Sequence, residues 1–109
     1  MNLKDKVETY FRLFSEKNIE NLSDLFSNEI ILKDWEILAI GKKEVISANK
    51  KIFSSVQSIC VNLKEFYQQD NVTTCLIEIE INNEEIIKVI DVIKFNEEFK
   101  IKEISAYKQ

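Results

Sequence analysis

The chain has 109 residues, of which 45% are hydrophobic, with a single glycine and no proline, and this composition predicts one domain, residues 1–109, with one packed core. Its formal net charge is −4, and without a basic stripe to neutralise phosphates we expect no nucleic-acid partner. No apolar run reaches the ~20 residues that a membrane span needs, and the N-terminus lacks a signal-peptide core, so we expect no membrane segment and a cytoplasmic location.

The residue types also limit the chemistry that a site could use. The sequence has no histidine, which excludes histidine-based catalytic triads. Pairing of strands around the turn at residues 69–70 would place Cys60 opposite about Ile79 and away from Cys75, so we expect two reduced thiols. Separated cysteines without histidine make a zinc or other soft-metal site improbable, and we expect no metal and no cofactor.

Apolar residues recur at helical spacing near the N-terminus. They predict a helix over about residues 3–17 with one apolar stripe, made of Leu3, Val7, Tyr10, Phe11 and Phe14. The hydroxyl group of Tyr10 should therefore point into the core. Asn18 is a suitable N-cap for a short second helix.

The middle of the chain predicts a hairpin followed by a third helix. Residues 29–35 and 37–40 form the hairpin, and on its first strand Ile30, Leu32 and Asp34 alternate with polar residues. By this period of two, Asp34 also points to the apolar side. Gly41 then interrupts the chain before an amphipathic third helix.

Four β-rich runs complete the sequence. Turn residues separate them at positions 69–71, 82–83 and 96–98. Helices first and strands last predict an α+β fold. Stacking the strands by these turns places Leu63, Leu76, Val89 and Asp91 on one face, which would line a cavity beneath the helices.

The opposite face of the strand over residues 72–81 would carry Cys75, Ile77 and Ile79. That surface is too apolar to stay exposed to water over such a length. We therefore expect a homodimer through the outer face of the sheet.

Asp91 is the most unusual residue of this sheet. It lies between Val89 and Ile93 on the apolar face of its strand. An isolated carboxylate is costly in such a place, so Asp91 should either find a partner or stay protonated. A protonated acid donates a hydrogen bond, whereas the alternative is a purely structural, hydrogen-bonded aspartate.

Four segments together carry a resemblance to a known family: residues 10–14 (YFRLF), 30–34 (IILKD), 41–44 (GKKE) and 89–97 (VIDVIKFNE). In this order they resemble the ketosteroid isomerases and, more broadly, the nuclear transport factor 2-like (SnoaL-like) superfamily. The resemblance implies a cone-shaped α+β fold, in which three N-terminal helices pack on a curved, mostly antiparallel sheet that encloses a pocket.

The resemblance also implies roles for three residues. Asp34 falls at the position of the general base, and Tyr10 and Asp91 fall at the oxyanion hole, where we expect them to be hydrogen-bonded to each other. The implied activity is an isomerase that moves a proton and a double bond next to the ketone of a small apolar substrate. The pocket would be lined by Phe14, Trp35, Asn49, Phe53, Val61, Leu63, Leu76, Val89, Ile93, Ile104 and Ala106.

Other interpretations remain open. Taken singly, Asp34 is also typical of a turn at the end of a strand, and Tyr10 of an ordinary core tyrosine. The whole chain could instead be a non-catalytic pocket for an apolar ligand or a dimeric interaction module.

The sequence departs from the isomerases at several positions. Trp35 follows Asp34 where they usually have proline, and Asn49 stands where some of them have a supporting tyrosine. Trp35 could contact a ligand or pack against the third helix. Phe99 replaces a turn glycine, and we expect a different turn there. These departures predict a more open or more polar pocket and speak against a steroid.

Overall fold

The computed structural model describes residues 2–109. Its elements follow the order α1 (Lys4–Ser15), α2 (Ile19–Leu25), β1 (Phe26–Lys33), β2 (Leu38–Ile40), α3 (Lys42–Ser55), β3 (Ile59–Gln69), β4 (Val72–Ile81), β5 (Glu85–Phe95) and β6 (Ile101–Lys108). The strands form one sheet in the order β2-β1-β6-β5-β4-β3, in which only β1 and β6 are parallel. The predicted α+β architecture is confirmed.

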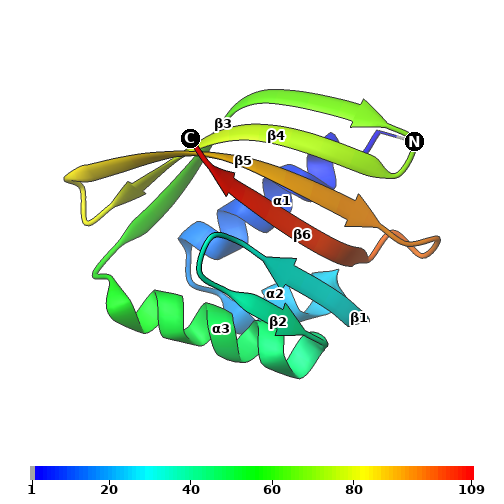
Figure 1. Cartoon of the computed structure of the whole chain (residues 1–109), viewed down its shortest axis with the longest axis horizontal. Coiled ribbons are helices and arrows are strands. Elements are labelled where there is room, and N and C mark those ends of the chain that lie inside the picture. The colour runs from blue at the N-terminus through cyan, green and yellow to red at the C-terminus, as the bar shows by residue number, and fades with distance from the viewer. Residues whose placement is uncertain (1) are drawn as a thin grey trace.

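Figure 1 shows how the helices lie on this curved sheet. The long strands β3, β4 and β5 form the upper side of the molecule in this view, and α3 runs along the lower side next to β2. Helix α1 packs against β3. No helix within residues 2–109 is long and apolar enough to cross a membrane.

Local signals set where the helices begin. The side chain of Asn18 accepts a hydrogen bond from the backbone N–H of Asn21 at 3.1 Å, which confirms it as the N-cap of α2. Gly41 precedes α3 with a φ of +90°, a value that suits glycine. Its N–H donates to the carbonyl oxygen of Ile30 at 2.7 Å and ties the start of α3 to β1.

The register of β4 differs from the prediction. Asp91 pairs with Cys75 across β4 and with Ala106 across β6, so these residues share one face of the sheet. Leu76 pairs with Ile90 and lies on the opposite face. The predicted position of Leu76 beside Asp91 is therefore wrong.

Two irregularities explain this reversal. The loop between β4 and β5 has three residues, 82–84, instead of two, so Ile81 pairs with Glu85. In β3 the pairing shifts at a bulge, because Glu65 pairs with Leu76 but Leu63 pairs with Ile77, which leaves Lys64 unpaired. Each single-residue shift exchanges the two faces of β4 relative to a neighbouring strand.

The residues predicted for the outer dimer surface lie on the inner face instead. Cys75 and Ile77 are buried, with exposed fractions of 0% and 4%, and Ile79 borders the internal cavity. This prediction is wrong for the same reason as that of Leu76. The outer face instead carries a cross-strand row of Leu76, Ile90 and Tyr107.

The two cysteines are as the sequence predicts, and the turn at Phe99 is not. Cys60 is exposed, Cys75 is buried, and both are free thiols as predicted. Cys60 pairs with Glu80, one residue from the expected partner. Phe99 does not form a different turn: its φ is +63°, the left-handed conformation that a glycine would adopt.

Candidate active site

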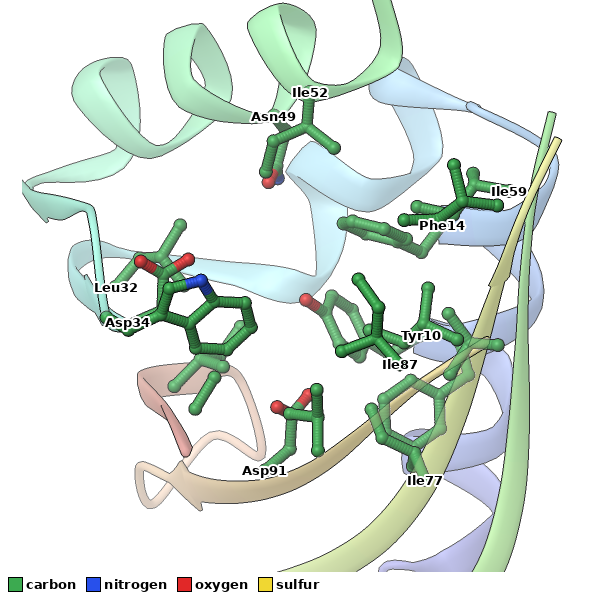
Figure 2. A pocket seen from close by; sticks show the side chains of 18 residues that line it. Tyr10, Phe14, Leu32, Asp34, Asn49, Ile52, Ile59, Ile77, Ile87 and Asp91 are labelled. Atoms are coloured by element: carbon green, nitrogen blue, oxygen red, sulfur yellow. The ribbon is translucent and has the colours of Figure 1, made fainter. Parts of the chain in front are cut away.

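The helices and the inner face of the sheet enclose a cavity with a volume of about 160 Å³. Its walls come from α1, α3, the end of β1 and strands β3 to β6 (Figure 2). Most lining side chains are apolar, and the polar ones are Tyr10, Asp34, Asn49 and Asp91. The three residues assigned to chemistry by the resemblance therefore meet in one cavity.

The structure places the other predicted lining residues in two groups. Those that line the cavity are Phe14, Trp35, Asn49, Val61, Val89, Ile104 and Ala106. Phe53 lies behind the wall, with its ring edge-on to Phe14 at 4.8 Å between centroids. Ile93 is fully buried in the core, Leu63 packs against the core, and Leu76 is on the outer face.

The sequence analysis missed several apolar lining residues: Phe11, Leu32, Ile52, Ile59, Ile77, Ile79, Ile81 and Ile87. A signal for β4 was present, because Ile77 and Ile79 alternate with Glu78 and Glu80. Charged residues at every second position mark the outer face of a half-buried strand.

Tyr10 is 5% exposed and is held by aromatic neighbours on one side. Its ring centroid lies 5.3 Å from that of Phe11 and 6.3 Å from that of Phe26. In Figure 2 its hydroxyl group points into the cavity. Burial, with a smaller contribution from the nearby Asp91, raises the pKa of Tyr10 well above its ordinary value. Tyr10 is therefore a hydrogen-bond donor at neutral pH.

Asp91 is 7% exposed in the middle of β5. Burial, and secondly the negative charge of Asp34, raise the pKa of Asp91 from 3.8 to about 7. No lysine or arginine lines the cavity to offset this effect. At pH values below about 7 the carboxyl group of Asp91 is mainly protonated and can donate a hydrogen bond.

The predicted hydrogen bond between Tyr10 and Asp91 is not formed among the described residues. Figure 2 shows their oxygen atoms on different walls, one on α1 and the other on β5, both facing the cavity. Because neither group satisfies the other, both remain available to an oxygen atom of a ligand placed between them.

Asp34 combines the two roles that the sequence left open. One carboxylate oxygen, Oδ1, accepts hydrogen bonds from the backbone N–H groups of Glu36 and Ile37, at 2.7 and 2.6 Å. This arrangement fixes the turn between β1 and β2. The same residue also lines the cavity, on the left in Figure 2, with Tyr10 and Asp91 to its right.

Trp35 stands beside Asp34 at the edge of the cavity. It is 45% exposed, and the ammonium group of Lys108 lies 5.7 Å from its ring centroid. This distance is typical of a cation–π contact. Trp35 also borders a surface groove that includes Tyr107 and Lys108. It therefore separates the cavity from the surface.

Asn49 extends from α3 into the end of the cavity that lies opposite Asp91. It is 3% exposed, and its amide group points into the open space in Figure 2. Its side chain makes no hydrogen bond to any of residues 2–109.

That same part of the chain contains no cluster of histidine, cysteine, aspartate or glutamate arranged to hold a metal ion.

Comparison with known proteins identifies the fold. No protein-family model and no curated protein matches the sequence. Among solved structures, a candidate SnoaL-like polyketide cyclase from Shewanella denitrificans has 12% identity and a TM-score of 0.84, over 100% of this chain and 92% of that one. A candidate isomerase of the SnoaL-like family from Agrobacterium tumefaciens has 13% identity and a TM-score of 0.83, over 94% and 93%.

A third similar structure is a protein with a ketosteroid isomerase-like fold from Catenulispora acidiphila, in complex with trimethylamine. It has 13% identity and a TM-score of 0.81, over 93% of this chain and 82% of that one. The chain therefore has the nuclear transport factor 2-like fold. Identities this low show the fold alone and do not carry an activity across.

Proposed function

We propose that the protein is an isomerase that moves the double bond of a small β,γ-unsaturated ketone into conjugation with the carbonyl group. One observation carries the proposal: Tyr10, Asp34 and Asp91 line a single, otherwise mainly apolar cavity. A base and two hydrogen-bond donors are the groups that this proton shift requires. In a cavity with little water, hydrogen bonds to a developing negative charge are also strongest.

Asp34 would act as the general base. Its Oδ1 atom is held by two backbone N–H groups, so the carboxylate has a fixed orientation. Its Oδ2 atom has no hydrogen bond within the described part of the chain, and it would take the proton from the α-carbon. The C–H electron pair then forms the enolate, and the same carboxylic acid returns the proton to the γ-carbon.

Tyr10 and Asp91 would hold the enolate oxygen. Each donates a hydrogen bond only when protonated, and the raised pKa values keep both protons in place below about pH 7. The negative charge develops on that oxygen in the transition state, so these two bonds strengthen as the reaction proceeds. The rate should fall above pH 7 as Asp91 ionises.

The size of the cavity narrows the substrate class. Its volume is about 160 Å³, close to that of an engineered apolar cavity of about 150 Å³ that binds benzene. A single ring matches this space, whereas a steroid would have to displace Trp35 and extend into the groove beyond it. The proposed substrate is therefore a monocyclic β,γ-unsaturated ketone.

The experiment compares cyclohex-3-enone with a steroid β,γ-enone and follows the ultraviolet absorbance of the conjugated product. Asp34→Asn should abolish turnover but keep the fold, since the amide oxygen can still accept both backbone hydrogen bonds. Asp34→Ala should abolish turnover and also lower stability, because the turn loses its acceptor.

Tyr10→Phe provides the second variant. It should lower the rate on the order of 10²–10³-fold while the base stays intact. No turnover above buffer by the parent protein on either ketone would overturn the isomerase. If phenols still bind tightly in that case, the cavity is a non-catalytic pocket.

A further inference from the structure

The amide group of Asn49 lines the cavity but has no part in the proposed reaction. Asn49 is 97% buried by surface area, since its exposed fraction is 3%. Its side chain makes no hydrogen bond within residues 2–109, and because Ser27 Oγ is the one polar side-chain atom of those residues that is both sealed from solvent and unpaired, the Asn49 amide must open onto the cavity. A group of this kind needs a partner from inside the cavity.

The position of Asn49 is separate from the oxyanion pair. It lies on α3, whereas Tyr10 and Asp91 lie on α1 and β5. Figure 2 shows its amide at one end of the cavity and Asp91 at the other. Between them the walls are apolar, with Ile52 from the same helix as Asn49 and Ile87 from β5. A ligand would thus meet polar groups at its two ends and apolar side chains in the middle.

We propose that Asn49 forms a second polar subsite, which binds a hydroxyl or carbonyl group on the far side of the ligand ring from the ketone. An amide both donates and accepts, so either oxygen group fits. Because the cavity matches one ring in size, the two oxygen functions belong on opposite positions of that ring. The substrate class becomes a monocyclic ketone with a second oxygen substituent.

The inference rests on the proposed function for the ketone end of the ligand. Its test, however, measures binding alone. Absence of turnover would therefore contradict the isomerase, whereas an unchanged ratio of dissociation constants would contradict the subsite. The probes are hydroquinone and 4-methylphenol, which have nearly the same size and differ by a hydroxyl group in place of a methyl group. Both keep one phenol oxygen for Tyr10 and Asp91.

Isothermal titration calorimetry in anaerobic buffer gives the dissociation constants of both probes for the parent and for Asn49→Leu. The ratio of the 4-methylphenol constant to the hydroquinone constant should fall about tenfold or more in the variant, because the hydroxyl group then faces an apolar side chain. Ile52→Val changes the same helix and the same cavity, and it should leave the ratio unchanged.

Asn49→Ala is a second test, for use if Asn49→Leu does not fold. It removes the amide without adding volume, and it should lower the ratio in the same direction. Equal ratios in the parent, Asn49→Leu and Asn49→Ala would overturn the subsite and show that water alone satisfies the amide. Loss of binding of both probes in equal measure would overturn it as well, since Asn49 would then only shape the cavity.

Discussion

Replacing Asp91 by asparagine should make the free energy of unfolding decrease less as the pH rises. In the folded protein the pKa of Asp91 is raised from 3.8 to about 7, so between these pH values the native state holds a proton that the unfolded chain has released. The corresponding stability is fully present below pH 3.8 and is lost as pH rises to about 7. About three pH units at about 1.4 kcal/mol each amount to about 4 kcal/mol.

Asp91→Asn has the same shape and does not titrate. Its free energy of unfolding, measured relative to the parent by urea denaturation and circular dichroism, should therefore rise by about 4 kcal/mol from about pH 3.5 to about pH 8. Asp34→Asn is the matched control, because it removes the charge that contributes to the raised pKa of Asp91. In this variant the free energy of unfolding should decrease less between about pH 3.5 and about pH 8 than it does in the parent protein. A difference between Asp91→Asn and the parent that stays constant across this range would refute the reasoning.

Two further predictions concern the turn at Phe99 and the outer face of the sheet. Phe99→Gly should stabilise the protein by about 0.5–1 kcal/mol, because a φ of +63° strains a residue with a side chain. Thermal melts test this, and Phe99→Ala should show no such gain. We also propose a homodimer through the outer row of Leu76, Ile90 and Tyr107. Ile90→Lys should then convert it to a monomer in light-scattering measurements, whereas a monomeric parent protein would contradict the proposal.

The sequence predicted features that depend on a single element. The helical spacing around Tyr10 set the direction of its side chain, the cap at Asn18 set the start of α2, and the strand alternation around Asp91 set its burial. Each of these depends on the geometry of neighbouring residues in the chain. The predictions therefore did not require knowledge of how the elements pack.

Features that depend on two elements were harder to predict. The face of β4 depends on the number of loop residues before β5 and on the bulge at Lys64, and the hydrophobic period of either strand does not reveal a one-residue shift. Glu78 and Glu80 alternate with Ile77 and Ile79 and indicate the outer face of β4, whereas pairing by the turns alone indicates the opposite face. The separation of Tyr10 from Asp91 depends on how α1 packs against the sheet, which no local pattern contains.

The register of β4 also affects the chemistry that we propose. With a two-residue loop at positions 82–83, Ile81 would pair with Glu84 and Thr74 with Asp91. The Thr74 hydroxyl group could then donate a hydrogen bond to the ionised carboxylate and lower its pKa. In the structure Cys75 occupies that place. Burial raises the pKa of the Cys75 thiol to about 12, so the thiol stays neutral and contributes no charge.

Below about pH 7 Tyr10, Asp91 and the Cys75 thiol beside Asp91 are therefore all neutral. Of these, Tyr10 and Asp91 share the cavity with the negatively charged Asp34. A single anion opposite neutral donors is the arrangement that removal of a proton from a ketone requires, because a second anion beside the carbonyl oxygen would oppose the charge that develops there. The three-residue loop between β4 and β5 thus does more than set the packing: it places a thiol, and not a hydroxyl group, next to the acid that has to remain protonated.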